Sequence, residues 1–366
     1  MNYNKIVSFL NLKFIYRKIM VSTCHKEKLV RFELAFTSNM VKIYDDLKNK
    51  EYTHGDYNVF LIKEPKYRVI MSENMYDKIV NHLVSYFILI PCLEKKLIDT
   101  NVATRKRKGT KCGIFYLKKY LNKIKINHDN VYVLKCDISK YFYNINHEIL
   151  FSMLKEDIKD ENVFLLIKEI IQSTDRQNVN EKIDSQVKKE IDKILSSNVT
   201  NKDDLILELR RIPHYNLGKG LPIGNETSQI LAIYYLNKMD HYIKEKLKVK
   251  YYIRYMDDFI LIHHDKKFLK KCLKEINKMV CDLDLSLNKK TQIYDMKKGF
   301  CFLGYKFVFK GKKLIILVNS KTKKRIKRKL RKLCKKDKLK YELSKKSYKG
   351  YFIVANSKEF RYRLKI

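Results

Sequence analysis

The sequence predicts an α+β fold, in which antiparallel strands combine with amphipathic helices. The run YYIRYMDDFILI, from Tyr251 to Ile262, is apolar and aromatic around the adjacent pair Asp257 and Asp258. Such a run is typical of buried strand, and two carboxylates in the middle of one would repel each other and lose hydration. We therefore expect a β-hairpin with the aspartates at its turn. A helix predicted over 74–90, with apolar residues at helical spacing, supports the mixed class.

A third carboxylate lies upstream. Residues 131–138, VYVLKCDI, are rich in β-branched and aromatic residues and predict a strand with Asp137 near its end. Clustered carboxylate oxygens are the ligands that Mg²⁺ prefers. Asp137 and Asp257 would hold two magnesium ions roughly 3.5–4 Å apart, clamping the attacking and leaving oxygens of a phosphoryl transfer. Two other Asp-Asp pairs, at 45–46 and 203–204, lie in polar surroundings typical of a solvated surface.

Five short stretches carry a resemblance to a known family. They are Asp137 with Phe142, GLPIGNETSQ at 220–229, Tyr255-Met256-Asp257-Asp258, LNKKT at 287–291 and FLGYKF at 302–307. In this order they resemble motifs A, B, C and D and the primer grip of bacterial reverse transcriptases, which are RNA-directed DNA polymerases. The resemblance covers about residues 55–356. The cofactor that it implies is Mg²⁺ (two ions), with Mn²⁺ as the alternative, and the implied metal-binding set is Asp137, Ile138, Asp257 and Asp258.

The resemblance implies a right-hand polymerase fold with fingers, a palm of antiparallel sheet plus helices, and a helical thumb. A polar, highly charged helical insertion is expected at about 151–211, within the palm. Basic residues dominate 321–349, as expected of a thumb helix that follows duplex phosphates. The expected lobes are 1–54 as an N-terminal helical extension, 55–125 as fingers, 126–310 as palm and 311–366 as thumb.

Two arginines are candidates for binding the nucleotide triphosphate. Arg68 lies on the second of two short strands expected over 58–71, and Arg105 lies in a basic loop at 99–113. Arginine binds phosphate through two parallel hydrogen bonds, and a glycine beside it permits close backbone approach. The alternative for the loop is a solvated basic surface. The sequence does not separate the roles of Arg68 and Arg105.

The resemblance places further side chains beside the carboxylates. Phe142 occupies the position of a steric gate against the ribose 2′-OH, the alternative being a core aromatic. Lys290 is the candidate general acid toward the leaving pyrophosphate and joins the three aspartates in the catalytic set, with Lys289 as a rival and a solvated lysine as the alternative. In the motif B stretch, Ile223, Gly224 and Gln229 are the candidate substrate-binding residues.

Composition bounds the partners. The chain has 366 residues with a formal net charge of +39, which favours a nucleic-acid partner, although an AT-rich genome would also raise the lysine content. Its eight cysteines have no zinc-binding spacing and are expected to be free, mostly buried thiols, with Cys136 in a packing role. No apolar run reaches the length of a membrane span, so no membrane partner is expected. Free cysteines favour a reducing cytoplasm, and the resemblance implies a bacterial one.

Motif B indicates the lineage. Its Ile-Gly and Ser-Gln pairs are similar to those of diversity-generating retroelements and of stand-alone defence-associated enzymes, rather than to intron maturases. The expected partners are an RNA template, nascent DNA and dNTPs, with a structured non-coding RNA or small accessory protein as further candidates. Two alternatives remain open: a nucleic-acid-binding defence protein with template-independent or vestigial polymerase activity, and a viral-type RNA polymerase.

Overall fold

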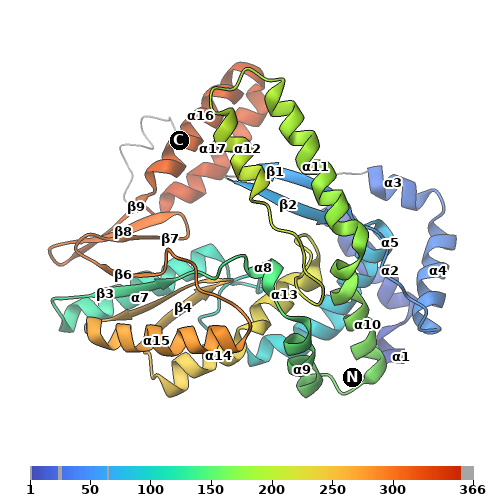
Figure 1. Cartoon of the computed structure of the whole chain (residues 1–366), viewed down its shortest axis with the longest axis horizontal. Coiled ribbons are helices and arrows are strands. Elements are labelled where there is room, and N and C mark those ends of the chain that lie inside the picture. The colour runs from blue at the N-terminus through green and yellow to red at the C-terminus, as the bar shows by residue number, and fades with distance from the viewer. Residues whose placement is uncertain (1, 24–26, 64–65, 356–366) are drawn as a thin grey trace. The chain divides into compact units, whose positions relative to one another are not determined.

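The computed structural model describes residues 2–23, 27–63 and 66–355, and the chain divides into two compact units (Figure 1). The chain alternates between them, so segments far apart in the sequence share each unit. The first unit comprises Met1–Ile98, Ile138–Asp240 and Met279–Ser286, and the second comprises Asp99–Asp137, His241–Lys278 and Leu287–Ile366.

Helices open the first unit. Ser8 caps the second of them, since its Oγ accepts a hydrogen bond from the Asn11 N–H at 3.2 Å. Its buried residues Leu12, Ile15 and Ile19 recur at helical spacing. The helical start predicted from the sequence is confirmed. The four helices are α1 (Tyr3–Ile6), α2 (Phe9–Ser22), α3 (Glu27–Glu33) and α4 (Phe36–Lys48).

A β-hairpin and an interrupted helix follow. Strands β1 (Asn58–Lys63) and β2 (Tyr67–Ser72) pair antiparallel, which confirms the two strands expected here; Glu64 and Pro65 lie outside the described residues. Beyond α5 (Met75–Val84), residues 85–89 form a π turn before Pro91, which has no N–H to donate into a regular α-helical ladder. The chain continues through α6 (Ile90–Leu93) and a 3₁₀ turn at Glu94–Lys96.

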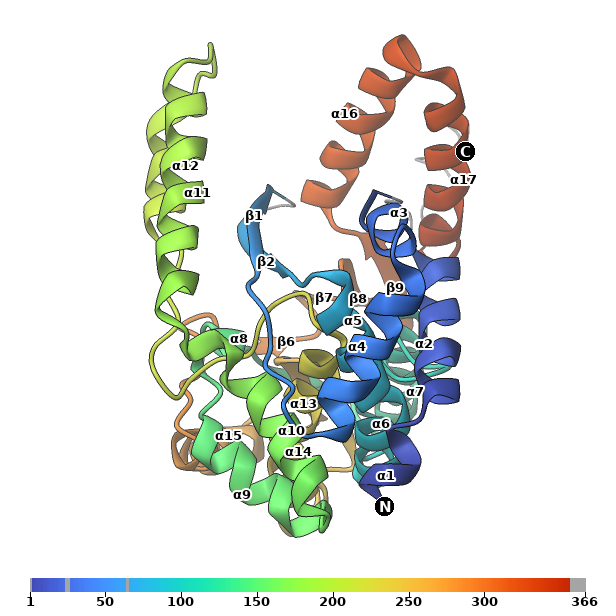
Figure 2. The ribbon, with the colours of Figure 1, turned by 90° about the vertical axis from the view of Figure 1, so that its right-hand side faces the viewer.

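The predicted insertion between motifs A and B is helical, as expected. Helices α11 (Gln177–Leu195) and α12 (Lys202–Arg210) lie side by side (Figure 2) and share a small core of Ile194, Leu205 and Leu209. Helix α11 also packs on β1. The other helices of this region are α8 (Tyr141–Asn144), α9 (His147–Asp157), α10 (Glu161–Gln172) and a 3₁₀ turn at Ser173–Asp175, with α13 (Glu226–Tyr235) and α14 (Asn237–His241) after the motif B loop.

A four-stranded antiparallel sheet forms the centre of the second unit. Its strand order is β4-β5-β3-β6, and α7 (Thr110–Asn127) packs against β4 and β5. The strand over 131–138 and the hairpin over 251–262 are both confirmed. A π turn at Tyr242–Lys246 precedes the hairpin and α15 (Lys266–Asp282) follows it. The strands are β3 (Tyr132–Cys136), β4 (Tyr251–Tyr255), β5 (Asp258–His263) and β6 (Gln292–Asp295).

The end of the chain adds a second antiparallel sheet and two helices. Strands β7 (Phe300–Phe302), β8 (Tyr305–Lys310) and β9 (Lys313–Val318) pair in sequence order, so the FLGYKF stretch forms a tight turn between β7 and β8. Helices α16 (Ser320–Lys336) and α17 (Lys338–Ile353) pack on each other (Figure 2). The basic stretch at 321–349, for which the sequence predicts one helix, therefore forms two, with Asp337 between them.

One expectation about cysteines is wrong. Among the residues that the structure describes, seven cysteines are free, but only Cys136 and Cys272 are buried. Cys281, Cys301 and Cys334 are exposed, and Cys92 and Cys112 are half-buried. Cys136 is fully buried, as expected for a packing role. No helix among the described residues is long and apolar enough to cross a membrane.

Candidate active site

Strand register brings the predicted carboxylates together. Strand β3 pairs antiparallel with β5, with Cys136 opposite Phe259, so one further step places Asp137 opposite Asp258. Opposite residues of an antiparallel pair project from the same face. Tyr255 pairs with Asp258, which leaves Met256 and Asp257 as the hairpin turn. All three aspartates therefore gather at one end of the central sheet of the second unit.

The turn differs from the expected one in a single respect. The sequence predicts both Asp257 and Asp258 in the turn, but Asp258 is the first residue of β5. A two-residue turn suffices because Met256 adopts a positive φ of 57°, which reverses the chain within two residues. Asp257 and Asp258 thus differ in backbone setting, one in the turn and one in the ladder.

Arg254 supports this turn, a role that sequence reasoning missed. Its side chain is fully buried, and its Nη1 donates a hydrogen bond to the Met256 carbonyl at 2.9 Å. Its backbone joins the 99–109 loop, since the Val102 N–H donates to the Arg254 carbonyl at 2.9 Å. A buried guanidinium is costly without such partners. The available signal was a lone arginine within an apolar strand.

Burial and mutual repulsion determine the charge state of the carboxylates. Burial raises the pKa of Asp258 to about 7, Lys135 opposes this, and the charges of Asp137 and Asp257 add to it. Burial also raises the pKa of Asp137, against the charges of Lys135 and Lys290. The carboxylates therefore affect one another electrostatically, as expected of a shared site.

Lys135 is the second residue that sequence reasoning missed. Its Nζ lies 3.1 Å from Asp258 Oδ2 and donates a hydrogen bond to the Cys301 carbonyl at 3.2 Å. It precedes Asp137 by two residues on one strand, so both side chains project from the same face. That spacing was the available signal. Lys135 links the carboxylate cluster to β7, where the primer-grip stretch begins.

The predicted general acid lies beside Asp137. The Asn288 N–H donates to the Asp137 carbonyl at 2.7 Å, and the side chain of Asn288 accepts from the Lys290 N–H at 3.1 Å. The Lys290 charge acts on the Asp137 carboxyl. Lys290 and Lys289 are both exposed, so each is accessible to a substrate.

The chemistry of this cluster fits a divalent cation. Asp258 Oδ1 is buried and has no hydrogen-bond partner. Burial raises the pKa of the same carboxyl, the charges of Asp137 and Asp257 add a smaller effect, and a bound cation would stabilise the charged form. The Ile138 side chain is buried, so this residue can offer only its backbone carbonyl. In the described part of the chain, no group of three or more His, Cys, Asp or Glu side chains is arranged so that it could hold a metal ion.

The predicted substrate-binding residues of the first unit lie around the motif B loop. The Leu221 N–H donates to the Phe142 carbonyl at 2.7 Å, which ties motif A to motif B. The Met71 N–H donates to the Ile223 carbonyl at 2.9 Å, which ties the loop to β2. Phe142 and Ile223 are half-buried.

Gly224 is required by its position. Its φ is +142°, and a Cβ there would lie 2.4 Å from the Met71 carbonyl oxygen. Any other residue would push the loop away from β2. Gln229 is exposed on α13. The loop thus presents Ile223 and Gly224 directly beside the strand that carries Arg68.

The two candidate arginines belong to different units. Arg68 is exposed on β2, and its charge opposes the burial that raises the pKa of Tyr143 to about 12, so it acts near α8. Arg105 belongs to the second unit, where its Nη1 donates to the Asn101 carbonyl at 3.0 Å. Arg68 therefore belongs to the same unit as Phe142 and Ile223.

No curated protein matches the chain. Among solved structures, it is similar to apo telomerase from Candida tropicalis truncated from its C-terminal domain, with 15% identity, a TM-score of 0.47, and coverage of 72% of this chain and 55% of that one. It is also similar to telomerase from Candida albicans in complex with a TWJ fragment of telomeric RNA, with 14% identity, a TM-score of 0.45, and coverage of 77% and 51%. The chain spans about half the length of these structures.

A family match is more extensive. The family described as Reverse transcriptase (RNA-dependent DNA polymerase) matches residues 61–307, more than half of the 366-residue chain. The matched segment contains every predicted catalytic residue and the motif B loop. The family's enzymes are nucleotidyltransferases with a right-hand polymerase fold, and they generally use divalent metal ions. This chain, with its mixed helices and antiparallel sheets, belongs to the reverse transcriptase family.

Proposed function

We propose that this protein extends a primer with deoxynucleotides on an RNA template, by a two-magnesium mechanism. The observation that carries the proposal is the meeting of Asp137, Asp257 and Asp258 at one end of the β4-β5-β3-β6 sheet, within the segment that matches the family. The charges of Asp137 and Asp257 add to the burial that raises the pKa of Asp258, as expected of carboxylates that share cations. The metal is Mg²⁺, with Mn²⁺ as a substitute.

The metal-binding residues are the three aspartates and the Ile138 carbonyl. Bound magnesium supplies charge that stabilises the attacking and leaving oxygens in phosphoryl transfer. Around it, the protein positions substrate and moves protons. Lys290, or its neighbour Lys289, delivers a proton to the leaving pyrophosphate, since both ammonium groups are exposed next to the Asp137 segment.

Residues of the first unit select the nucleotide. Phe142 blocks the ribose 2′-OH, Ile223 and Gly224 line the nucleotide site through the motif B loop, and Gln229 projects from the following helix. Arg68 binds the triphosphate beside them, and Arg105 is a second phosphate-binding candidate. The support is that Arg68, Phe142 and Ile223 belong to one contact network, through β2 and α8.

Primer extension on an RNA template with Mg²⁺ tests the proposal. Asp137→Ala and Asp257→Ala should each lower the rate by about 10³-fold or more, because each removes a charge that holds the metal ions at the transition state. Asp203→Ala is the matched control, since Asp203 also belongs to an Asp-Asp pair but is exposed in the first turn of α12. Near wild-type synthesis by Asp137→Ala or Asp257→Ala, with folding intact, would contradict the mechanism.

We place the enzyme in a bacterial retroelement or an anti-phage defence system. The support is the Ile223-Gly224 and Ser228-Gln229 form of motif B. A template repeat and a small basic accessory protein encoded beside the gene would favour the retroelement, and their absence would favour defence. Sequencing the nucleic acid that copurifies with the protein would identify the template. Synthesis without a template would instead indicate the template-independent alternative.

A further inference from the structure

Within the first unit, side chains from outside the catalytic motifs hold the motif B loop in place. Asn225 Nδ2 donates a hydrogen bond to Tyr57 Oη at 2.9 Å, and Thr227 Oγ1 donates to Asn81 Oδ1 at 2.7 Å. All four residues are buried. Together with the bond from Met71 to Ile223, these contacts hold residues 223, 225 and 227 of the motif B stretch.

Asn225 does not make the hydrogen bond that is usual for an N-cap residue and contacts Tyr57 instead. It is the N-cap of α13, with φ −78° and ψ 145°, yet its side chain makes no capping hydrogen bond. An asparagine at an N-cap normally accepts from the first turn, which contributes about 1 kcal/mol. Here its amide group turns toward Tyr57, and its Oδ1 is buried without a partner. The Asn225 side chain thus makes a long-range contact with Tyr57 in place of a local helix-capping hydrogen bond.

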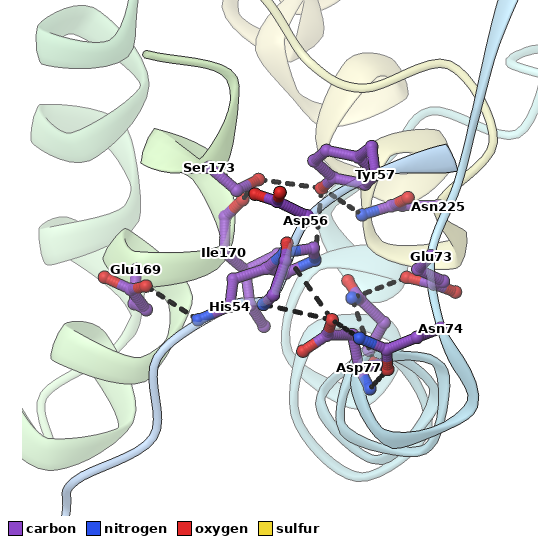
Figure 3. Close-up of polar contacts among 12 residues, drawn as sticks. His54, Asp56, Tyr57, Glu73, Asn74, Asp77, Glu169, Ile170, Ser173 and Asn225 are labelled. Carbon is purple, nitrogen blue, oxygen red and sulfur yellow. Dashed lines mark hydrogen bonds and ion pairs between the residues drawn. The ribbon is translucent and has the colours of Figure 1, made fainter. Parts of the chain in front are cut away.

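Tyr57 is the centre of a directed hydrogen-bond chain (Figure 3). His54 Nδ1 lies 2.7 Å from the Gly55 carbonyl, which can only accept, so this nitrogen carries the proton. In the neutral ring, Nε2 is then the acceptor, and the Tyr57 hydroxyl, 3.1 Å away, donates a hydrogen bond to it. Burial lowers the pKa of His54, consistent with a neutral ring. The Tyr57 oxygen is left free to accept from Asn225.

The far end of the chain is anchored in rigid structure. The Tyr57 hydroxyl also lies 2.7 Å from Ser173 Oγ, at the end of α10, and the His54 N–H donates to Glu169 Oε1 at 2.8 Å (Figure 3). These partners come from helical elements, so Tyr57 cannot shift without breaking several buried bonds. Its orientation is therefore transmitted to Asn225.

We propose that Tyr57 is a positioning residue for nucleotide selection, which acts by orienting Asn225 and so holding Ile223 and Gly224 against β2. The inference rests on the proposed function in taking the motif B loop as part of the nucleotide site. The Tyr57 hydroxyl contacts the side chain of Asn225. Tyr57 affects the position of the motif B loop at the moment when a nucleotide binds.

Tyr52 provides a matched control. Like Tyr57 it is a buried tyrosine, its ring packs on His54, and its hydroxyl enters the same polar cluster. Its hydroxyl donates instead to Asp77 Oδ1 at 3.0 Å, whereas the Tyr57 hydroxyl contacts Asn225 of motif B. Phenylalanine at either position removes one buried hydroxyl, so a general loss of stability should affect both variants alike.

The primary test compares Tyr57→Phe with Tyr52→Phe in single-nucleotide extension. We expect Tyr57→Phe to raise the KM for dNTP about tenfold while kcat changes less than about threefold, because one buried hydrogen bond to the loop is lost. Tyr52→Phe should leave both values within about twofold of wild type. Equal effects in the two variants, or an unchanged KM in Tyr57→Phe, would overturn the inference.

A second variant separates positioning from stability. Asn225→Ser restores an N-cap side chain but cannot reach Tyr57, so its melting temperature should be at least that of wild type while its KM rises. The KM of the double variant Tyr57→Phe/Asn225→Ser should be no higher than the higher KM of the two single variants. Both substitutions remove the same contact between Tyr57 and Asn225. Additive losses would show that Tyr57 acts elsewhere.

Hydrogen exchange of the 223–227 amides supplies a readout that does not need catalysis. Exchange should be faster in Tyr57→Phe than in wild type and unchanged in Tyr52→Phe. If wild-type protein fails to extend primers, the proposed function fails, whereas the exchange result still decides the positioning role. Unaltered exchange in Tyr57→Phe would contradict that role whatever the activity.

Discussion

Burial raises the pKa of one carboxyl group in each unit, and the charged neighbours that add to or oppose this effect differ. Asp258, in the second unit, has a pKa raised to about 7 amid other carboxylates and Lys135. Glu73, in the first unit, has a pKa raised to about 8 by burial and by Asp77, with Lys78 and Lys28 opposing and Glu226 adding a smaller effect. Asn81 Nδ2 donates to Glu73 Oε2 at 2.7 Å, and the carbonyl of the same amide holds Thr227 of motif B.

Glu73 should make the stability of the protein depend on pH. Its folded pKa lies above the ordinary value of 4.5, so the folded state binds more protons, and stability falls as pH rises from about 4.5 through about 8. Glu73→Gln keeps an acceptor for Asn81 but does not titrate. In denaturant unfolding it should remove a loss on the order of a few kcal/mol between pH 5 and 9. The exposed Glu51→Gln is the control, and parallel pH profiles for wild type and Glu73→Gln would contradict the assignment.

Phe142 should exclude ribonucleotides. Its ring is half-buried and its backbone is fixed by the bond from Leu221, so the side chain rather than a mobile loop determines the space near the sugar. Phe142→Val should lower the preference for dNTP over NTP by about tenfold or more, because the steric barrier is removed. The same change at Phe115, which is 62% exposed on α7, is the control. Retained selectivity in an active Phe142→Val enzyme would make Phe142 a packing residue.

Ile223 should limit the accuracy of copying. Its side chain has no donor or acceptor, and apolar pockets discriminate poorly between similar substrates. Because its backbone is held by Met71, a longer polar side chain can be introduced without releasing the loop. Ile223→Gln should lower misincorporation by about tenfold, most visibly opposite adenine. Ile126→Gln, at an 81% exposed position, is the control, and identical error spectra would exclude a fidelity role.

At the scale of elements, the α11–α12 pair supports the β1–β2 hairpin. Glu208 Oε1 accepts from the Tyr67 N–H at 3.0 Å, and Glu190 Oε1 accepts from the Tyr67 hydroxyl at 3.2 Å. An isolated two-stranded hairpin is marginally stable in water. The charged insertion, whose role the sequence left open, therefore holds the residue next to Arg68.

Helix α16 should bind duplex phosphates. Ile326 and Leu330 are buried, while Lys324, Arg328 and Arg331 are exposed on the opposite face at spacings of four and three residues. Replacing these three by glutamine should flatten the salt dependence of duplex affinity by about 0.9 for each lost phosphate contact. The test is a titration of duplex binding at several salt concentrations.

The control uses another exposed set of charges. Lys188, Lys189 and Lys193 on α11 are exposed among acidic residues, so glutamine there should change the slope much less. Equal slopes for wild type and the α16 variant would mean that the lysine content of this helix reflects composition alone.

At the scale of the whole molecule, the site residues divide between the two units. The aspartates, Lys135 and Lys290 belong to the second unit, and Arg68, Phe142 and the motif B loop belong to the first. The second unit holds the groups that we propose for phosphoryl transfer, and the first holds the groups that we expect to select the nucleotide. The net charge of +39 is compatible with both tasks on a polyanionic partner.

The sequence by itself determined the strands, the helices and the identity of the carboxylates. Apolar runs, helical periodicity and short motifs are local properties, so β3, the β4–β5 hairpin and the helices around them could be predicted, as could Asp137, Asp257 and Asp258. The hairpin turn was misjudged by one residue because its register depends on the positive φ of Met256.

Only the tertiary structure decided which distant side chains support these residues. Lys135 and Cys301 are 166 positions apart, and Tyr57 and Asn225 are 168 apart. No local pattern marks such pairs, because they depend on strand register, on packing and on where a buried polar group finds its partner. The same is true of the contact that Arg254 makes at the turn and of the assignment of Arg68 and Arg105 to different units. The positions of the reacting groups followed from chemistry that is local in the chain, and the way they are held followed from contacts that are not.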